Sequence, residues 1–357
     1  MGRAPGKYVS VVFKISTPVE KPLPAAKGFG AVGETKMMNA SARLARSITW
    51  ASSKQTYFTA RFLSDRDLAD NCLRAYAYFR WADDMIDISI TGREQRFAFI
   101  ERQKALIEKL YRGERPSDLV PEETMLTDLI ACDRAPGSGL SSFIRNFMSV
   151  IEFDAHRYGR IASPHELTAY TTCLATAVMD GIQYFIGNSH SYPKTPERIM
   201  AVTGAHITHM LRDALEDLSS GLVNIPAESL GARVMDKRDI NSEWFCLWVR
   251  EQVELARYCF RQGKTYIDSL AVLRCKLAGV WYCARFECIL NAIERDGYRL
   301  HSNYCERHAL KTWLEMARLA LVATWKHMAG RIRSSFYPSS HFSNLNPIKN
   351  TPSYHIK

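Results

Sequence analysis

Apolar residues recur at helical spacing along most of the 357-residue chain. From residue 39 to about residue 325 they fall at positions i, i+3 and i+4, which turns one face of a helix toward a core. The pattern is clearest in eight segments: 66–90, 96–112, 138–158, 165–187, 195–218, 243–272, 274–296 and 306–325. The sequence shows no convincing alternating strands and no repeat of fixed period. It therefore predicts one all-α domain, 39–325, built from many helices.

The two ends of the chain differ from this body. Residues 1–38 contain clustered prolines and frequent glycines without a persistent period, which predicts a disordered basic leader. An N-terminal targeting peptide is the alternative reading of the leader. Residues 326–357 are rich in Ser, Asn and Pro and predict a basic irregular tail. The leader also spells GxGxxG, but a dinucleotide-binding motif needs a strand before it, and a proline-rich stretch stands there instead, so we reject that motif.

Charge is concentrated at these ends. The chain has 47 basic and 37 acidic side chains, a net charge of +10, yet residues 51–316 carry a net charge of only −2. A nucleic-acid-binding fold would need a basic folded face, so we expect no nucleic-acid partner. Basic ends suit loose attachment to an anionic membrane surface. The 9 scattered cysteines include no CxxC pair and indicate a reducing compartment. We therefore expect a cytoplasmic protein, favoured as a monomer, with peripheral membrane contact.

Two pairs of aspartates carry the most informative chemistry. Asp83 and Asp87 are four residues apart, and Asp213 and Asp217 repeat that spacing. Residues four apart share one face of a helix, where like charges repel unless a cation lies between them. One such pair is common on a solvated helix face, but two pairs on apolar helices, each beside an arginine, favour a site. Mg²⁺ typically joins one or two carboxylates to substrate phosphates, so two facing pairs would suit Mg²⁺ and a diphosphate.

With these motifs the chain resembles the squalene/phytoene synthases, the head-to-head coupling branch of the all-α isoprenoid synthases. The resemblance covers roughly residues 50–312 and rests on two aspartate helices, Tyr76–Asp87 and His206–Asp217, in this order. The stretches Ser53–Leu63 and Phe147–Asp154 support it. The resemblance implies a single-domain isoprenoid-synthase-type helical bundle around a central cavity.

The resemblance also implies a role for each matching position. The metal, Mg²⁺ or alternatively Mn²⁺, would be held by four carboxylates: Asp83, Asp87, Asp213 and Asp217. Diphosphate oxygens would be neutralised, or the metal ligands oriented, by four side chains: Ser53, Lys54, Arg80 and Arg212. Tyr76 would line the cavity near the reacting carbons. The implied reaction joins two farnesyl or two geranylgeranyl diphosphates through a cyclopropylcarbinyl diphosphate to a phytoene-like or squalene-like 1–1′ product.

The chain departs from the family pattern on its second aspartate helix, where His206 and His209 replace the usual Gln and Asn. Histidine is a softer ligand than Mg²⁺ prefers. Alternatively, the two histidines accept protons, donate hydrogen bonds to the diphosphate, or are purely structural residues of a polar cavity wall. The substitutions motivate two alternatives: a diverged terpenoid synthase that releases a cyclopropyl diphosphate or another coupled or cyclised product, and a non-catalytic assembly factor. The four intact aspartates favour catalysis, and the missing NADPH fingerprint favours a non-reductive product.

Overall fold

The computed structural model describes residues 40–114, 116–133, 137–157, 160–188, 190–219, 225–230, 239–304 and 310–336. Over these residues the chain forms helices and no strand, which confirms the all-α prediction. None of the described helices is long and apolar enough to span a membrane. The predicted leader, 1–38, and the last part of the predicted tail, 337–357, lie outside the described residues.

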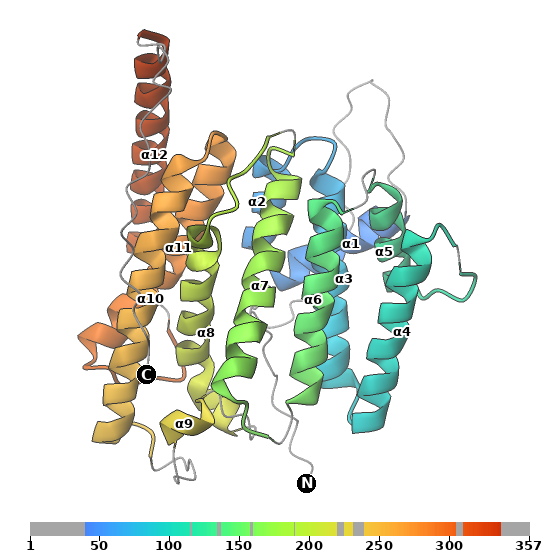
Figure 1. The fold of residues 1–357 in the computed structure, drawn as a ribbon, viewed down its shortest axis with the longest axis horizontal. Helices are drawn as coiled ribbons and strands as arrows, with labels where there is room; N and C mark the ends of the chain where they lie inside the picture. The colour runs from blue at the N-terminus through green and yellow to red at the C-terminus, as the bar shows by residue number, and fades with distance from the viewer. Residues whose placement is uncertain are drawn as a thin grey trace, which may run out of the picture.

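The helices follow one another in chain order (Figure 1). Their bounds are α1 (Ala40–Ser52), α2 (Lys54–Leu63), α3 (Ala69–Asp84), a π-helical turn η1 (Met85–Ser89), α4 (Arg93–Tyr111), α5 (Pro121–Ala131), α6 (Gly139–His156), α7 (Pro164–Phe185), a 3₁₀ turn η2 (Pro196–Ile199), α8 (Met200–Ser219), α9 (Ala227–Leu230), α10 (Glu243–Ser269), α11 (Leu273–Arg295) and α12 (Leu310–Phe336).

The middle of the bundle is formed by α3, α6, α7 and α8 (Figure 1). Helix α3 also packs against α1 and α5, while α8 packs against α10 and α11. The apolar core has two parts. One gathers the rings of Phe79, Phe143 and Phe147 around α3, α6 and α7. The other gathers Phe245, Phe260 and Phe286 around α8, α10 and α11. The first aspartate segment therefore belongs to one core and the second to the other.

Serine residues fix where several of these helices begin. The Ser53, Ser138, Ser163 and Ser242 side chains each accept a hydrogen bond from the backbone N–H three residues later. Such N-caps satisfy backbone donors that have no partner within the helix. At α7 the Glu166 carboxylate also accepts from the backbone N–H of Ser163, which completes a capping box. The start of α7, which carries residues of the site described below, is thus held by its own sequence.

The sequence predicts one helix over residues 66–90, but the observed helix changes its winding at the first aspartate pair. Asp83 lies in the last turn of α3, whereas Asp87 lies in the π-helical turn. The backbone N–H of Ile90 donates to the carbonyl of Met85, five residues back, at 2.8 Å. A π turn is wider than an α turn and is found mostly at functional sites. Asp83 and Asp87 are therefore not on one regular α-helix, as the spacing alone predicted.

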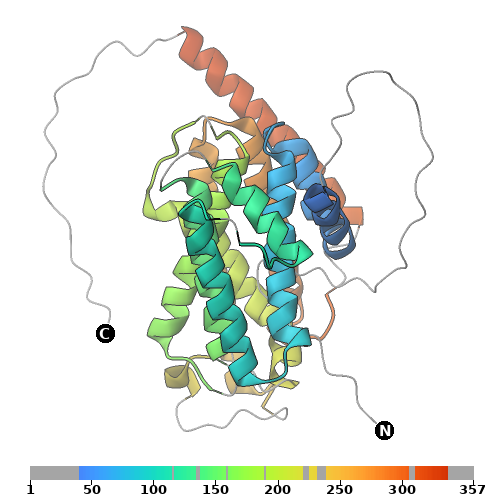
Figure 2. The ribbon, with the colours of Figure 1, turned by 90° about the vertical axis from the view of Figure 1, so that its right-hand side faces the viewer.

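The predicted irregular tail, 326–357, is wrong for its first eleven residues, because α12 continues to Phe336. Residues 326–333 are mostly good helix formers such as Lys, Met, Ala and Arg, so they extend the helix. The residue before a proline is disfavoured in a helix, and Pro338 follows Tyr337 in the sequence. Figures 1 and 2 both show α12 projecting beyond the upper end of the bundle. The helical part of the chain thus extends past the predicted boundary at 325.

Candidate active site

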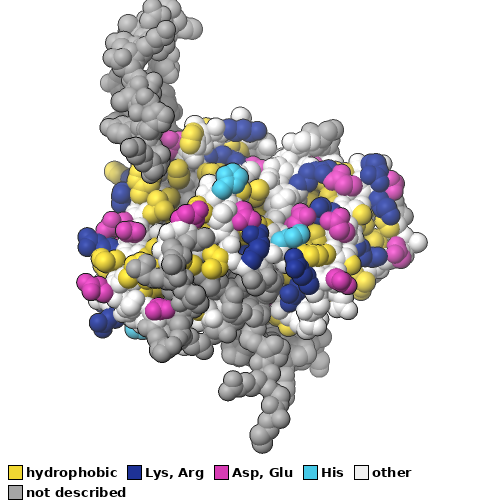
Figure 3. Space-filling view, turned by 60° about the horizontal axis from the view of Figure 1, so that its bottom comes forward, with side chains coloured by type: hydrophobic (Ala, Val, Ile, Leu, Met, Phe, Trp, Pro, Cys, Tyr) yellow, Lys and Arg dark blue, Asp and Glu magenta, His cyan; other side chains and the backbone are white. Residues whose placement is uncertain are grey.

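Both aspartate segments lie at the lower end of the bundle in Figure 1. Helices α3, α6 and α8 run down to that end, and α7 begins there. Figure 3 brings this end forward and shows acidic, basic and histidine side chains close together near its middle. The ends of α3 and α8 and the start of α7 are therefore close together, although they are widely separated in the sequence.

Arg157, directly after α6, connects the two aspartate segments. Its guanidinium lies 2.9 Å from the carboxylate of Asp154 and also interacts electrostatically with Asp87 and Asp217. Burial alone would lower the pKa of Arg157, but Asp154, Tyr170, Asp217 and Asp87 outweigh it and raise that pKa. Because one arginine interacts with Asp87 and with Asp217, the two segments face the same central cation.

The first segment contains an internal ion pair between Arg80 and Asp84. Arg80 donates from Nε to Asp84 at 3.0 Å and from Nη2 to the other Asp84 oxygen at 2.5 Å. Asp83 is 7% exposed, and its charge acts on both Arg80 and Tyr170 of α7. Arg80 was predicted to bind diphosphate or to orient metal ligands. Here it neutralises the carboxylate next to Asp83, so its contact with diphosphate stays a prediction.

The second segment is paired differently. Arg212 donates from Nε and Nη2 to the two oxygens of Asp213, both at 2.6 Å. His209 Nδ1 lies 3.6 Å from an Asp213 oxygen. Burial raises the pKa of Asp213, but His209 and Arg212 outweigh burial and hold that pKa far below its usual range. Asp217, one turn later, is 8% exposed. In this segment the arginine neutralises a motif aspartate itself.

The two histidines of α8 are buried and neutral. Burial, together with the charge of Arg157 for His206 and of Arg212 for His209, lowers both pKa values to about 3. Neither ring nitrogen of His206 has a hydrogen-bond partner, and its ring packs 5.3 Å from the Tyr170 ring. A buried polar group without a protein partner is costly, so the His206 nitrogens are open to a bound water or ligand. The reading of His206 as a satisfied structural residue is therefore disfavoured.

Tyr76 and Ser53 lie above this site, toward the middle of the bundle. Tyr76 is 2% exposed and shares a hydrogen bond with Ser53, the N-cap of α2. Burial raises the pKa of Tyr76 far above its usual value, so its hydroxyl stays protonated. Lys54 is exposed, and its ammonium lies 5.6 Å from the centroid of the Trp50 ring. As diphosphate ligands, Ser53 and Lys54 stay predictions.

An apolar cavity of about 160 Å³ lies between the helices, farther up the bundle than the aspartates. Its walls come from α2, α3, α6, α7 and α11, and they include four aromatic side chains: Phe143, Phe185, Trp281 and Tyr282. Tyr76 and Arg285 also line it, and Arg285 interacts electrostatically with His209. Along α3, Asp83 follows Tyr76 by seven residues, or about 10 Å at the rise of an α-helix. The predicted central cavity is therefore present and ends near the charged groups.

The donor set fits a metal held jointly with a ligand. Within the described ranges, no group of three or more His, Cys, Asp or Glu side chains is close enough to hold a metal ion alone. Mg²⁺ usually takes one or two carboxylates and completes its shell with water and substrate phosphates. Asp87 and Asp217 offer such hard oxygen ligands near Arg157, and Asp83 precedes Asp87 by four residues. The residues thus suit Mg²⁺ bound together with a diphosphate and not a closed metal cage.

Sequence reasoning did not single out Arg157 or Tyr170. The Tyr170 hydroxyl donates to Asp154 at 3.2 Å, which ties α7 to α6 beside the site. Burial raises the pKa of Asp154, and Arg157 opposes that shift. The available signal was Asp154 itself, an acidic residue within an apolar helix face, followed three residues later by an arginine. An i, i+3 pair of this kind marks a buried charge that needs a partner.

Comparisons with known proteins agree with this geometry. The sequence model of the squalene/phytoene synthase family matches residues 50–314. No curated protein sequence matches the chain. Among solved structures, squalene synthase HpnC from Alicyclobacillus acidocaldarius superposes with a TM-score of 0.58 at 18% sequence identity, covering 73% of this chain and 95% of that one. At that identity the superposition shows the fold alone. The family match over most of its length shows that this chain belongs to the squalene/phytoene synthase family, whose members are prenyltransferases that join prenyl diphosphates head to head.

Proposed function

We propose that the chain catalyses the Mg²⁺-dependent 1–1′ condensation of two allylic prenyl diphosphates through a cyclopropylcarbinyl diphosphate. The observation that carries the proposal is the position of Arg157, which interacts electrostatically with an aspartate of each segment. Arginine binds two phosphate oxygens with one planar fork. A diphosphate between the segments would therefore meet a cation, while its hydrocarbon tail enters the cavity.

Different residues of the chain then have different roles in the ionisation of the diphosphate. Bound Mg²⁺ would neutralise the negative charge that develops on the departing diphosphate. Asp83, Asp87 and Asp217 fix the position of that charge, and Arg157 donates hydrogen bonds to the diphosphate oxygens. The neutral Tyr76 hydroxyl, held by Ser53, donates into the space between the charged site and the cavity. The Phe143, Trp281 and Tyr282 rings exclude water and stabilise an allylic cation through their π faces.

The buried histidines support a product formed without reduction. A final carbocation becomes a neutral alkene when it loses a proton, and a neutral imidazole nitrogen without a partner is able to accept it. His206 and His209 are both neutral near pH 7. A phytoene-like product needs this proton loss, whereas a squalene-like product needs a hydride donor such as NADPH. We therefore favour the phytoene-like outcome and a His206 or His209 proton acceptor.

Product analysis tests the proposal. Purified protein is incubated with farnesyl or geranylgeranyl diphosphate and Mg²⁺, with and without NADPH, and extracts are examined by mass spectrometry. We expect a 1–1′ linked hydrocarbon whose amount does not depend on NADPH and which disappears with EDTA. Accumulation of a cyclopropyl diphosphate would support the diverged synthase in its place. If neither substrate is consumed, the chain is not this enzyme.

We also propose that the protein works in the cytoplasm and contacts anionic membranes at its surface. Helix α12 exposes several large apolar side chains, among them Leu321 at 73% and Trp325 at 72%. Residues 317–357 carry six basic and no acidic side chains, which complements an anionic bilayer. We expect Trp325→Ser to reduce binding to phosphatidylserine vesicles in a salt-dependent way. The matched variant Leu247→Ser, on exposed α10, should bind as the parent does, and equal binding by both variants would contradict the proposal.

A further inference from the structure

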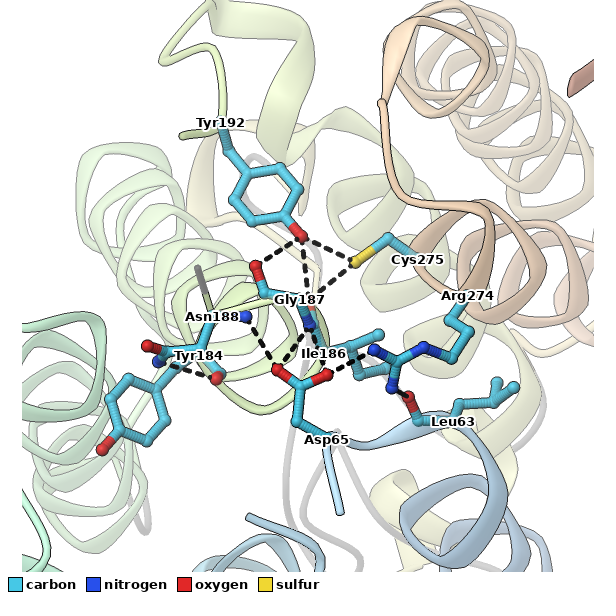
Figure 4. Close-up of polar contacts among 9 residues, drawn as sticks. All are labelled: Leu63, Asp65, Tyr184, Ile186, Gly187, Asn188, Tyr192, Arg274 and Cys275. Atoms are coloured by element: carbon cyan, nitrogen blue, oxygen red, sulfur yellow. Dashed lines mark hydrogen bonds and ion pairs between the residues drawn. The ribbon is translucent and has the colours of Figure 1, made fainter. Parts of the chain in front are cut away.

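A second polar cluster, drawn in Figure 4, lies where α7 ends, at the upper end of the bundle in Figure 1. It joins the end of α2, the end of α7 and the start of α11. We call it the Asp65 clamp, and it consists of five residues: Asp65, Gly187, Tyr192, Arg274 and Cys275. The catalytic scheme above does not use this cluster.

Asp65 is the centre of the clamp. Its carboxylate accepts hydrogen bonds from the backbone N–H groups of Gly187 and Asn188, at 3.1 and 3.0 Å, and from Arg274 at 2.5 Å. Arg274 also donates to the carbonyl of Leu63 at 2.7 Å. Burial raises the pKa of Asp65, but these donors outweigh it and lower that pKa. One carboxylate thus ties its own segment to two others, which are 122 and 209 residues away in the sequence.

Tyr192 closes the same cluster from the other side. Its hydroxyl lies 2.8 Å from the carbonyl of Ile186 and 3.2 Å from the sulfur of Cys275. The Cys275 thiol in turn donates to the Ile186 carbonyl at 3.0 Å. Gly187 adopts a positive φ of 75°, and a Cβ there would lie 2.5 Å from the Tyr192 hydroxyl. Only glycine fits this position, so the turn after α7 is built for the clamp.

The clamped helices are also walls of the apolar cavity. Ser64 and Ile186 line the cavity, and they adjoin Asp65 and Gly187 respectively. The carbonyl of Ile186 belongs to the clamp while its residue borders the cavity. Along α7, Phe185 lies 15 residues beyond Tyr170, which is about 22 Å at the rise of an α-helix. The clamp therefore holds the cavity walls together at the end far from the diphosphate site.

We propose that the Asp65 clamp fixes the spacing of α2, α7 and α11 at the far end of the cavity and so limits the length of prenyl chain that the protein accepts. This inference rests on the proposed function, because the charged site must hold the diphosphate for the tail to point at the clamp. Asp65 acts here as a positioning residue for chain length. It touches no reacting atom.

The preference of the protein for one prenyl chain length over another measures this role directly. Binding of the unreactive thiodiphosphate analogues of farnesyl and geranylgeranyl diphosphate is measured by calorimetry with Mg²⁺, and the ratio of the two Kd values is compared between variants. We expect Asp65→Asn to shift that ratio toward the longer chain by at least about tenfold, the discrimination that a single methylene commonly gives. Ser64→Leu, which fills the same end of the cavity, should shift it toward the shorter chain.

A matched variant separates this role from general stability. Glu294→Gln breaks the exposed Arg257–Glu294 pair, which joins α10 to α11 away from the cavity, and should leave the ratio unchanged. Should Asp65→Asn fail to fold, Arg274→Gln keeps the backbone hydrogen bonds of Asp65 and must show the same shift. A lower melting temperature with an unchanged ratio would overturn the inference while the proposed function stands. If the parent protein binds neither analogue, the inference and the proposed function both fail.

Discussion

The two aspartate segments share one spacing and have different electrostatics. In the first, Arg80 engages both oxygens of Asp84, the residue next to the motif aspartate Asp83. In the second, Arg212 engages both oxygens of Asp213, a motif aspartate. The first segment also ends in a π turn, whereas α8 stays α-helical through Asp217.

This difference shows that the spacing of the aspartates predicts where they lie on a helix but not which arginine neutralises which carboxylate. A carboxylate already bound by arginine attracts a metal less than one whose neighbours are acidic. We therefore infer that Asp213 adds little metal affinity while Arg212 holds both of its oxygens. Arg157 joins the two unequal halves.

The largest expected effect is on turnover, from removing a carboxylate of the first segment. Asp83→Asn should lower kcat/KM on the order of 10²–10³-fold, as loss of one preorganised charge contact does. Asp213→Asn should cost less, because Arg212 already occupies the Asp213 oxygens. Steady-state kinetics with saturating Mg²⁺ measure both, and Asp84→Asn is the neighbouring control. Equal losses for Asp83→Asn and Asp213→Asn would contradict the inequality of the segments.

The next effect is on stability, from removing the cation that the segments share. Arg157→Met leaves the buried Asp154 carboxylate without its ion-pair partner, which should cost about 3 kcal/mol of unfolding free energy. Urea denaturation in EDTA measures this cost. Arg160→Met is a matched control, because the Arg160–Glu166 pair is exposed and worth at most about 1 kcal/mol. Similar losses from both variants would show that Arg157 is an ordinary surface arginine.

A third effect is the pH dependence of stability that the second segment alone should add. The His206 and His209 pKa values are about 3 in the folded protein and 6.5 in the unfolded chain. Between these values the unfolded chain binds more protons, so stability falls as the pH drops below 6.5 and levels off below 3. Each histidine should remove up to about 1.4 kcal/mol per pH unit.

Urea midpoints at pH 7 and pH 5 test this slope. The double variant His206→Gln, His209→Asn should lose clearly less stability over that interval than the parent. His165→Gln, at an exposed position, should behave as the parent does. A double variant with an unchanged slope would mean that the buried histidines do not stay neutral.

Much of the fold was accessible from the sequence because helix periodicity is local. Segment 138–158 predicts α6 and segment 243–272 predicts α10 within a few residues. The π turn at Asp87 was not predictable, since its winding depends on the packing around it and not on spacing. The continuation of α12 was missed because Ser and Pro further along obscured good helix formers before them.

For the candidate site, too, some residues were predictable from the sequence and others were not. The aspartates were found from an i, i+4 pattern that a short stretch of sequence contains. Arg157 was missed because its partners Asp87 and Asp217 are 70 and 60 residues away and meet only in the folded bundle. Ion pairing was equally hidden: nothing in the sequence says that Arg80 pairs with Asp84 while Arg212 pairs with its immediate neighbour Asp213.

Calorimetric titration of the farnesyl thiodiphosphate analogue into the parent protein, Asp83→Asn and Asp217→Asn, with Mg²⁺ and with EDTA, tests most directly whether both segments hold one metal–diphosphate site. We expect binding to require Mg²⁺ and to weaken roughly 10–100-fold or more in each variant, the scale for losing a metal-site group. Binding that is as tight in EDTA as in Mg²⁺, or that ignores the aspartates of either segment, would contradict the shared site.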